Sequence, residues 1–260
     1  MQKRTNVLVI SDTVDFITIK QMEIILLQMK KSICMIKGKS TGTGFFCSIN
    51  YENKDIPCLI TNYQVIDDEY IKENKKIEIS LNDNEKNEDI IVCEQDIIYQ
   101  SKKDEYDLII IKIKERQEYM KFINYLELDD NLFGESIKAY NSIYIPHYAN
   151  AQNAAVSYGK CILYDPNYKR DMQIKFNTLS GASGGPILNL LTNKVIGIHK
   201  GCIQKNGEVK YNIGTLLKAP LEELKNKGNK IINQIKNNNV NNDFNIELKN
   251  PIYELKYHTA

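Results

Sequence analysis

Residues 180–186 constrain this chain more than any other stretch, because they place three glycines and a proline around two serines. Glycine reaches backbone angles that residues with a Cβ avoid, and it allows another backbone to approach closely. A serine in such a turn presents its hydroxyl beside backbone N–H groups that can hold a developing oxyanion. The turn runs into the apolar residues 186–188. The sequence therefore predicts a nucleophile turn, with Ser183 as the nucleophile, at the start of a strand.

Two other segments complete a pattern with this turn. Asp107 leads into an apolar run, Leu-Ile-Ile-Ile, and residues 58–66 read Cys-Leu-Ile-Thr-Asn-Tyr-Gln-Val-Ile. Together the three segments resemble the trypsin-like serine peptidases of the chymotrypsin superfamily, whose triad follows the chain order His, Asp, Ser. The resemblance spans about residues 32–225. It implies an all-β fold of two six-stranded antiparallel β-barrels, with Asp107 as the orienting carboxylate.

The histidine position of this pattern is occupied by Gln64. A serine hydroxyl needs a neighbour that takes its proton and returns it to the leaving amine, and imidazole does both because it titrates near neutral pH. A glutamine amide only forms hydrogen bonds. The oxyanion hole implied by the resemblance, the N–H groups of Gly181 and Ser183, is intact. We therefore predict a peptidase homologue with very low activity. The sequence leaves open whether Gln64 is native or engineered.

Two of the three histidines offer no replacement base. His147 and His258 do not lie in the Thr-Asn-x-x-Val context that surrounds position 64, and we expect both to be ordinary surface or loop residues. The third, His199, belongs to a segment with a different role.

Substrate preference follows from the residues before and after the nucleophile. Thr178 and the segment Ile-Gly-Ile-His-Lys-Gly that contains His199 resemble the glutamyl endopeptidases. A hydroxyl and an imidazole can hydrogen-bond the carboxylate or carboxamide of a P1 side chain, and Lys200 adds positive charge. Asn177 is not acidic, which disfavours Lys or Arg at P1, and Gly201 completes the pocket segment. The resemblance thus implies Glu or Gln at P1, although His199 alone is also compatible with capping a strand.

The domain boundaries follow from changes in residue pattern. We expect an N-terminal helical extension over 1–31 with its helix at 18–31, a first β-barrel over 32–114, a connector over 115–133, a second β-barrel over 134–218, a C-terminal helix over 219–236, and a linker and tail over 237–260. The first barrel is predicted to hold strands at 33–36, 44–49, 57–62, 76–81, 90–94 and 108–113. The second is predicted to hold strands at 136–145, 155–163, 172–176, 185–190, 194–199 and 209–214.

The composition of the chain limits the classes of molecule that it is expected to bind. A net charge of +1 disfavours a nucleic acid or a membrane surface, so a peptide or protein is the expected partner. The six cysteines form no Cys-x-x-Cys pair, so we expect no metal, no cofactor and buried free thiols, although Cys47 and Cys58 flank a hairpin and can approach each other. The apolar run at 7–10 is too short for a signal peptide, which predicts an intracellular, cytoplasmic protein.

Three functions remain open from the sequence. The first is a pseudopeptidase that binds extended peptides without turning them over. The second is a serine endopeptidase in which Gln64 is a recent or deliberate substitution, since Ser183, Asp107, Gly181 and Thr178 are all present. The third is a non-catalytic interaction module that uses the helix at 18–31 and the C-terminal tail. Cleavage of P1-Glu or P1-Gln peptides by a Gln64→His variant separates the second from the others.

Overall fold

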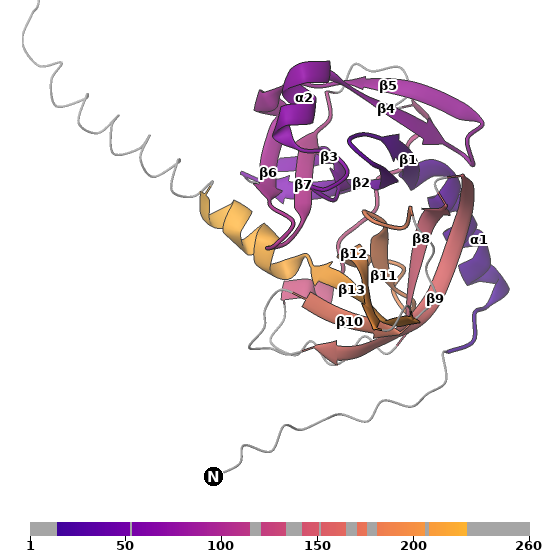
Figure 1. Cartoon of the computed structure of the whole chain (residues 1–260). Coiled ribbons are helices and arrows are strands. Elements are labelled where there is room, and N and C mark those ends of the chain that lie inside the picture. The colour runs from indigo at the N-terminus through magenta and orange to yellow at the C-terminus, as the bar shows by residue number, and fades with distance from the viewer. Residues whose placement is uncertain are drawn as a thin grey trace, which may run out of the picture.

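The chain folds into two antiparallel β units that lie side by side (Figure 1). The computed structural model describes residues 15–52, 54–114, 121–133, 142–150, 152–164, 171–175, 181–205 and 208–227. One unit is a seven-stranded sheet and the other is a closed six-stranded barrel, and helices are few. The predicted fold class, an all-β double barrel of the chymotrypsin type, is confirmed.

The first unit has the strand order β5-β4-β1-β2-β3-β7-β6. Its strands are β1 (Ile33–Lys37), β2 (Thr41–Tyr51), β3 (Lys54–Thr61), β4 (Lys76–Leu81), β5 (Lys86–Ile91), β6 (Ile97–Ser101) and β7 (Leu108–Lys112). This sheet has seven strands where the sequence pattern predicted six. Asn82, Asp83 and Asn84 all adopt positive φ, so the β4–β5 turn closes early and β5 begins at Lys86. The next segment, after a 3₁₀ turn, is then free to form β6.

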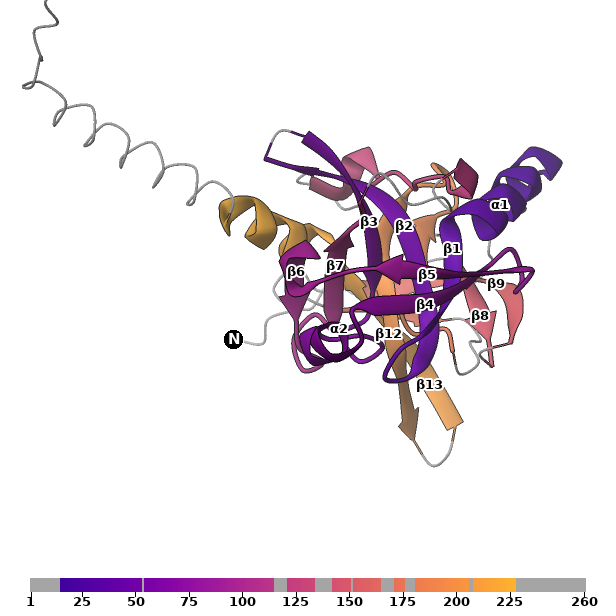
Figure 2. The same ribbon diagram turned by 90° about the horizontal axis from the view of Figure 1, so that it is seen from above.

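The second unit closes on itself in the order β10-β13-β12-β11-β8-β9. Its strands are β8 (Ile143–Ala149), β9 (Asn153–Tyr164), β10 (Asp171–Lys175), β11 (Pro186–Asn189), β12 (Val195–Lys205) and β13 (Glu208–Leu216). β12 extends well beyond its predicted end at 199 and forms a long hairpin with β13, which lies close to its predicted range (Figure 2). The beginning of the predicted strand at 136–145 lies outside the described residues.

A shared apolar core joins the two units. One cluster of buried side chains contains Phe45 and Ile60 from the first sheet together with Tyr148 and Ile187 from the second barrel. Thr43 on β2 reinforces this junction, because its hydroxyl accepts a hydrogen bond from the backbone N–H of Tyr148 (3.1 Å). The cluster removes apolar side-chain surface from water, and each fully buried Ile or Phe contributes about 1.5–3 kcal/mol to the stability of the fold. The junction is therefore a rigid base for any site between the units.

The predicted N-terminal helix is present as α1 (Ile19–Ser32). Thr18 and Gln21 form a capping box, in which each side chain bonds the other's backbone N–H, and this satisfies two donors at the helix start. Ile25 and Met29 pack into the core. Three other apolar positions of the predicted helix face remain exposed: Ile19 at 76%, Met22 at 53% and Leu26 at 55%. Only one edge of the predicted apolar face is therefore buried.

A C-terminal helix follows β13 over residues 218–227, and the rest of its predicted range lies outside the described residues. Leu221 and Leu224 anchor it in the core. In Figures 1 and 2 this helix, drawn in gold, lies beside β6. No helix in the described part of the chain is both long and apolar enough to span a bilayer.

All six cysteines are free thiols. Four are buried as predicted, Cys93 is partly exposed, and Cys202 is exposed because it lies on the projecting β12–β13 hairpin. Cys47 and Cys58 lie directly opposite each other on β2 and β3, as the hairpin prediction anticipated.

Candidate active site

Three predicted site residues meet between the two units. β3 and β7 pair antiparallel, with Thr61 opposite Ile109, so the turn after β3 lies beside the segment before β7. This pairing brings Gln64 to Asp107. Ser183 comes from the second barrel, in the turn before β11, and its backbone carbonyl accepts a hydrogen bond from the N–H of Thr43 (2.8 Å). The site is thus held by both units at their junction.

Asp107 is buried and held from several sides. Its backbone carbonyl accepts a hydrogen bond from the side chain of Asn62 (2.8 Å), and its own φ of 50° lies in the left-handed region. Its carboxylate accepts two hydrogen bonds from Gln64, one from the backbone N–H (2.9 Å) and one from Nε2 (2.8 Å). Burial raises the pKa of Asp107, and the hydrogen bonds from Gln64 and the charges of Lys200 and Lys103 oppose that rise.

The amide of Gln64 is fully committed as a donor. Nε2 bonds Asp107 Oδ2 at 2.8 Å and the backbone carbonyl of Lys200 at 2.9 Å. Both partners are acceptors, so the nitrogen and not the oxygen of the amide must face them. The hydroxyl of Ser183 also donates to the Lys200 carbonyl, at 3.3 Å. A carbonyl oxygen is a poor proton acceptor, so within the part of the chain that the structure describes the Ser183 hydroxyl is bonded to no general base.

The nucleophile turn depends on Gly184. Its φ of +87° is unfavourable for a residue with a side chain, and a Cβ there would overlap the Thr43 carbonyl oxygen and lie 2.5 Å from Thr61 Oγ1. Its N–H donates to the carbonyl of His199 (2.9 Å), and the N–H of Gly185 donates to the carbonyl of Ala182 (3.0 Å). The turn is therefore packed tightly against both β2 and β12.

The two N–H groups predicted to form the oxyanion hole belong to Gly181 and Ser183, and their bonding differs from that of the Gly184 and Gly185 amides. Within the ranges that the structure describes, no acceptor is bonded to the N–H of Gly181 or of Ser183. Gly181 has a φ of 91°, and its carbonyl accepts a hydrogen bond from Thr43 Oγ1 (2.8 Å). The hydroxyl of Thr43 thus ties the turn to the first sheet.

The segments that carry Gln64, Asp107 and Ser183 all fall within one known protein family. The family model described as "trypsin-like peptidase domain" matches residues 42–198, more than half of the chain, and this range includes Gln64, Asp107 and Ser183. The chain belongs to the trypsin-like peptidase domain family. A search of curated proteins found no match to the sequence.

Two solved structures share the fold of this trypsin-like peptidase domain. The serine endoprotease from Yersinia pestis is similar with a TM-score of 0.57 at 13% identity, over 83% of this chain and 69% of that chain. Rv3671c from M. tuberculosis, crystallised as a serine-to-alanine mutant in its inactive form, is similar with a TM-score of 0.53 at 14% identity. That match covers 82% of this chain and 97% of that chain. At this level of identity the similarity concerns the fold alone.

His199 lies behind the nucleophile turn of the trypsin-like domain. It is 3% exposed, and its Nε2 lies 3.2 Å from Asn212 Oδ1. Burial lowers the pKa of His199, so the ring is neutral at pH 7 and offers hydrogen bonds instead of a charge. Two other predicted pocket residues, Asn177 and Thr178, lie outside the described residues, and the pocket role of His199 stays a prediction.

Lys200 contributes both its backbone carbonyl and its positive charge to the site. Its Nζ donates to the carbonyl of Glu105 (2.7 Å), in the turn that leads to Asp107. Its carbonyl is the shared acceptor of Gln64 and Ser183. The next residue, Gly201, has open space around the position of a Cβ. This role of the Lys200 carbonyl could not be predicted from the sequence, because every residue has a backbone carbonyl and the residue type does not show which one is used.

The prediction that His147 is a surface or loop residue is wrong. His147 lies on β8, is 2% exposed, and places Nε2 at 3.0 Å from Ser157 Oγ. Burial, with a smaller contribution from His199, lowers its pKa to about 4. Its apolar neighbours in the sequence, Tyr144, Ile145 and Tyr148, are the signal that could have placed it inside. The other histidine, His258, lies outside the described residues.

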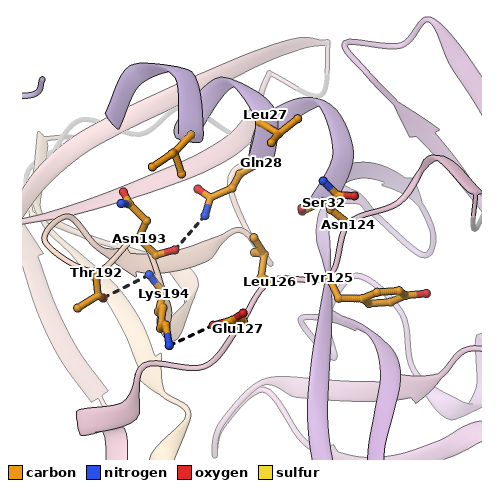
Figure 3. A pocket seen from close by; sticks show the side chains of 11 residues that line it. Leu27, Gln28, Ser32, Asn124, Tyr125, Leu126, Glu127, Thr192, Asn193 and Lys194 are labelled. Carbon is orange, nitrogen blue, oxygen red and sulfur yellow. Dashed lines mark hydrogen bonds and ion pairs between the residues drawn. The ribbon is translucent and has the colours of Figure 1, made fainter. Parts of the chain in front are cut away.

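A separate hollow of about 310 Å³ lies away from Ser183, between α1, the connector and the turn after β11 (Figure 3). Leu27 and Gln28 of α1 line one side, and the segments 124–127 and 192–194 line the others. Gln28 Nε2 donates to the carbonyl of Asn193 (2.9 Å), and Lys194 pairs with Glu127 (3.0 Å). These contacts fasten α1 and the connector to the second barrel.

Proposed function

We propose that this trypsin-like peptidase domain binds extended peptides at Ser183 and hydrolyses them very slowly. The observation that carries the proposal is the position of the Gln64 amide. Its two N–H groups bond Asp107 and the Lys200 carbonyl, and the Ser183 hydroxyl is left bonded to the same carbonyl. The Gln64 amide hydrogen-bonds Asp107 as a histidine at this position would. Unlike a histidine, it cannot accept the serine proton and deliver it to the leaving group.

Peptide binding is supported by the parts of the site that remain. The N–H groups of Gly181 and Ser183 point to no acceptor within the described residues, so they can receive a ligand carbonyl. Binding and an oxyanion hole alone supply about 10³–10⁴-fold rate enhancement over water in related triad enzymes. The native protein is therefore expected to release a bound peptide many times before it cleaves one.

The P1 side chain that we propose is Glu or Gln. His199, buried and neutral, offers hydrogen bonding at the base of the predicted pocket, and Gly201 leaves open space beside it. A neutral imidazole recognises a carboxamide as well as a carboxylate. The Lys200 ammonium is bonded to the Glu105 carbonyl but keeps its positive charge, which favours Glu over Gln.

The test compares the native protein with a Gln64→His variant on a fluorogenic peptide library. We expect cleavage by the variant at P1 Glu or Gln, with a rate gain on the order of 10³-fold or more. The double variant Gln64→His/Ser183→Ala is the control and should be silent. The native protein should bind the same peptides uncleaved, as measured by fluorescence anisotropy.

Two results would contradict the proposal. Native cleavage at a rate near that of the variant would show that another group acts as base. Silence of both proteins, together with no peptide binding by the native chain, would show that the cleft is not a peptide site.

A further inference from the structure

The turn that carries Asp107 is tied to the C-terminal helix by a carboxylate shared between two tyrosines. Glu223 on the helix accepts the hydroxyl of Tyr106 at 2.8 Å on Oε1 and the hydroxyl of Tyr99 at 2.9 Å on Oε2. Hydrogen bonds to an ionised acceptor are shorter and about twice as strong as neutral ones. Both tyrosines are buried, at 6% and 4% exposure, so their hydroxyls would be costly to leave without this partner.

Tyr106 is the residue before Asp107, and its peptide group is also held. Thr215 Oγ1, from β13, donates to the carbonyl of Tyr106 (2.8 Å), and the Tyr106 N–H donates to Ser101 Oγ (3.2 Å). The N–H of Asp107 itself donates to the carbonyl of Lys102 (2.9 Å). The peptide group between Tyr106 and Asp107 is therefore fixed through its carbonyl, its N–H and the tyrosine ring.

This bracing matters because Asp107 has a φ of 50°. A non-glycine residue in the left-handed region costs about 1–2 kcal/mol, and such a conformation persists only when its surroundings over-determine it. With that φ, the carboxylate meets the backbone N–H and Nε2 of Gln64 together. A small rotation of the turn would break at least one of these two bonds.

We propose that Glu223 is a positioning residue: through Tyr106 it holds the turn in the conformation that aims the Asp107 carboxylate at position 64. Tyr106 and Glu223 are 117 residues apart in the sequence, so the last described helix of the chain stabilises the acid of the site. Leu221 and Leu224 bury the same helix in the core and keep Glu223 in place. The inference concerns the site of the proposed function but requires neither peptide binding nor cleavage.

The chain offers a matched pair of variants. Tyr106→Phe and Tyr99→Phe each remove one hydroxyl from the same carboxylate, but only Tyr106 adjoins Asp107. Glu223→Ala removes both bonds and leaves two buried tyrosine hydroxyls without this partner, so it should be the most destabilising of the three. Thermal unfolding identifies which variants keep the fold, and Tyr106→Phe and Tyr99→Phe, which each remove one bond, should be milder than Glu223→Ala.

The first readout is hydrogen exchange of the Gln64 side-chain amide by NMR in the full chain. We expect about fivefold faster exchange in Tyr106→Phe and Glu223→Ala, the factor that one lost hydrogen bond implies, and a native rate in Tyr99→Phe. The second readout uses the Gln64→His background. There the Asp107 carboxylate raises the pKa of the imidazole at position 64, and Tyr106→Phe should lower that pKa by about 0.5.

Two results would overturn the inference. Unchanged amide exchange and imidazole pKa in folded Tyr106→Phe and Glu223→Ala would show that the helix does not position Asp107. An equal effect of Tyr99→Phe would show that the helix acts only through general packing. Neither readout involves a peptide, so a failure of the proposed function leaves this test intact.

Discussion

The nucleophile turn and the general-base position sit within one site but have opposite tolerances. The turn is held by packing, because Gly184 has no room for a side chain against Thr43 and Thr61. The base position is held by hydrogen bonds, because Gln64 donates to Asp107 and to the Lys200 carbonyl. Close packing at position 184 tolerates glycine alone, whereas the acceptors around position 64 can bind any side chain that is long enough and carries a hydrogen-bond donor. Chemistry can therefore be lost at position 64 while the geometry of the site is retained.

The largest effect should come from Gly184→Ala. The substitution combines a forbidden φ with overlap at the Thr43 carbonyl, so we expect the free energy of unfolding to fall by about 4 kcal/mol or more. Gly201→Ala is the matched control, since a Cβ there meets nothing within 4 Å. Urea unfolding measures both. Equal stability of the two variants would contradict the packing account of the turn.

Gln64→Glu tests the hydrogen-bonded half of the comparison. It places a second carboxylate within hydrogen-bond distance of Asp107. At such a short distance the two carboxylates cannot both be ionised. We expect a loss of about 3 kcal/mol at pH 7. The shared site raises the folded-state pKa of the pair above its unfolded value, so this penalty should disappear as the pH falls through that raised pKa. Stability curves from pH 7 to pH 4 provide the measurement.

Gln64→Met is the control for the charge. It removes the same Nε2 hydrogen bonds without adding a carboxylate. Loss of the bond to Asp107 raises the pKa of that one carboxyl only, so the stability loss should recover less in acid than that of Gln64→Glu. A Gln64→Glu protein as stable as native at pH 7 would show that the turn moves to separate the two groups.

His147 allows a test of the barrel that supports the nucleophile turn. Its pKa falls from 6.5 to about 4 on folding, because burial disfavours the charged ring. The unfolded chain therefore binds a proton below pH 6.5 that the folded chain does not bind until about pH 4. Stability from this group is present at pH 7 and is lost as the pH falls, by about 2 kcal/mol at pH 5.

The variant His147→Gln should lack this acid-dependent loss. Urea unfolding of native protein and variant at pH 7 and pH 5 isolates the contribution, because the lowered pKa of His199 affects both proteins alike. Parallel pH dependence in the two proteins would mean that His147 is solvated in the folded state.

The smallest expected effect concerns the tie between the units. Thr43→Val removes the hydroxyl that donates to the Gly181 carbonyl and accepts from the Tyr148 N–H, at a cost of about 1–2 kcal/mol. Thr41→Val, at an exposed position of the same strand, should change stability by less than about 0.5 kcal/mol. If the two changes cost the same, the hydroxyl of Thr43 does not join the units.

Motif residues could be read from the sequence because each has a chemical requirement of its own. The glycines around Ser183 indicated a turn that no other residue permits, and the acid before the apolar run at 108–111 indicated the edge of a buried strand. The fold class and the helix at α1 followed from the same kind of local pattern. Strand counts were less accurate, since β6 depends on where the β4–β5 turn closes.

The family, the fold class and the lack of a histidine at position 64 can all be read from the amino-acid sequence. Three features required the folded chain: the Lys200 carbonyl that bonds both Gln64 and Ser183, the burial of His147, and the hydrogen bond from Tyr106 to Glu223. The physical reason is that residue type records local requirements, such as a φ angle or a proton acceptor. Backbone carbonyls, burial and contacts across more than a hundred residues arise only when the two units close on each other.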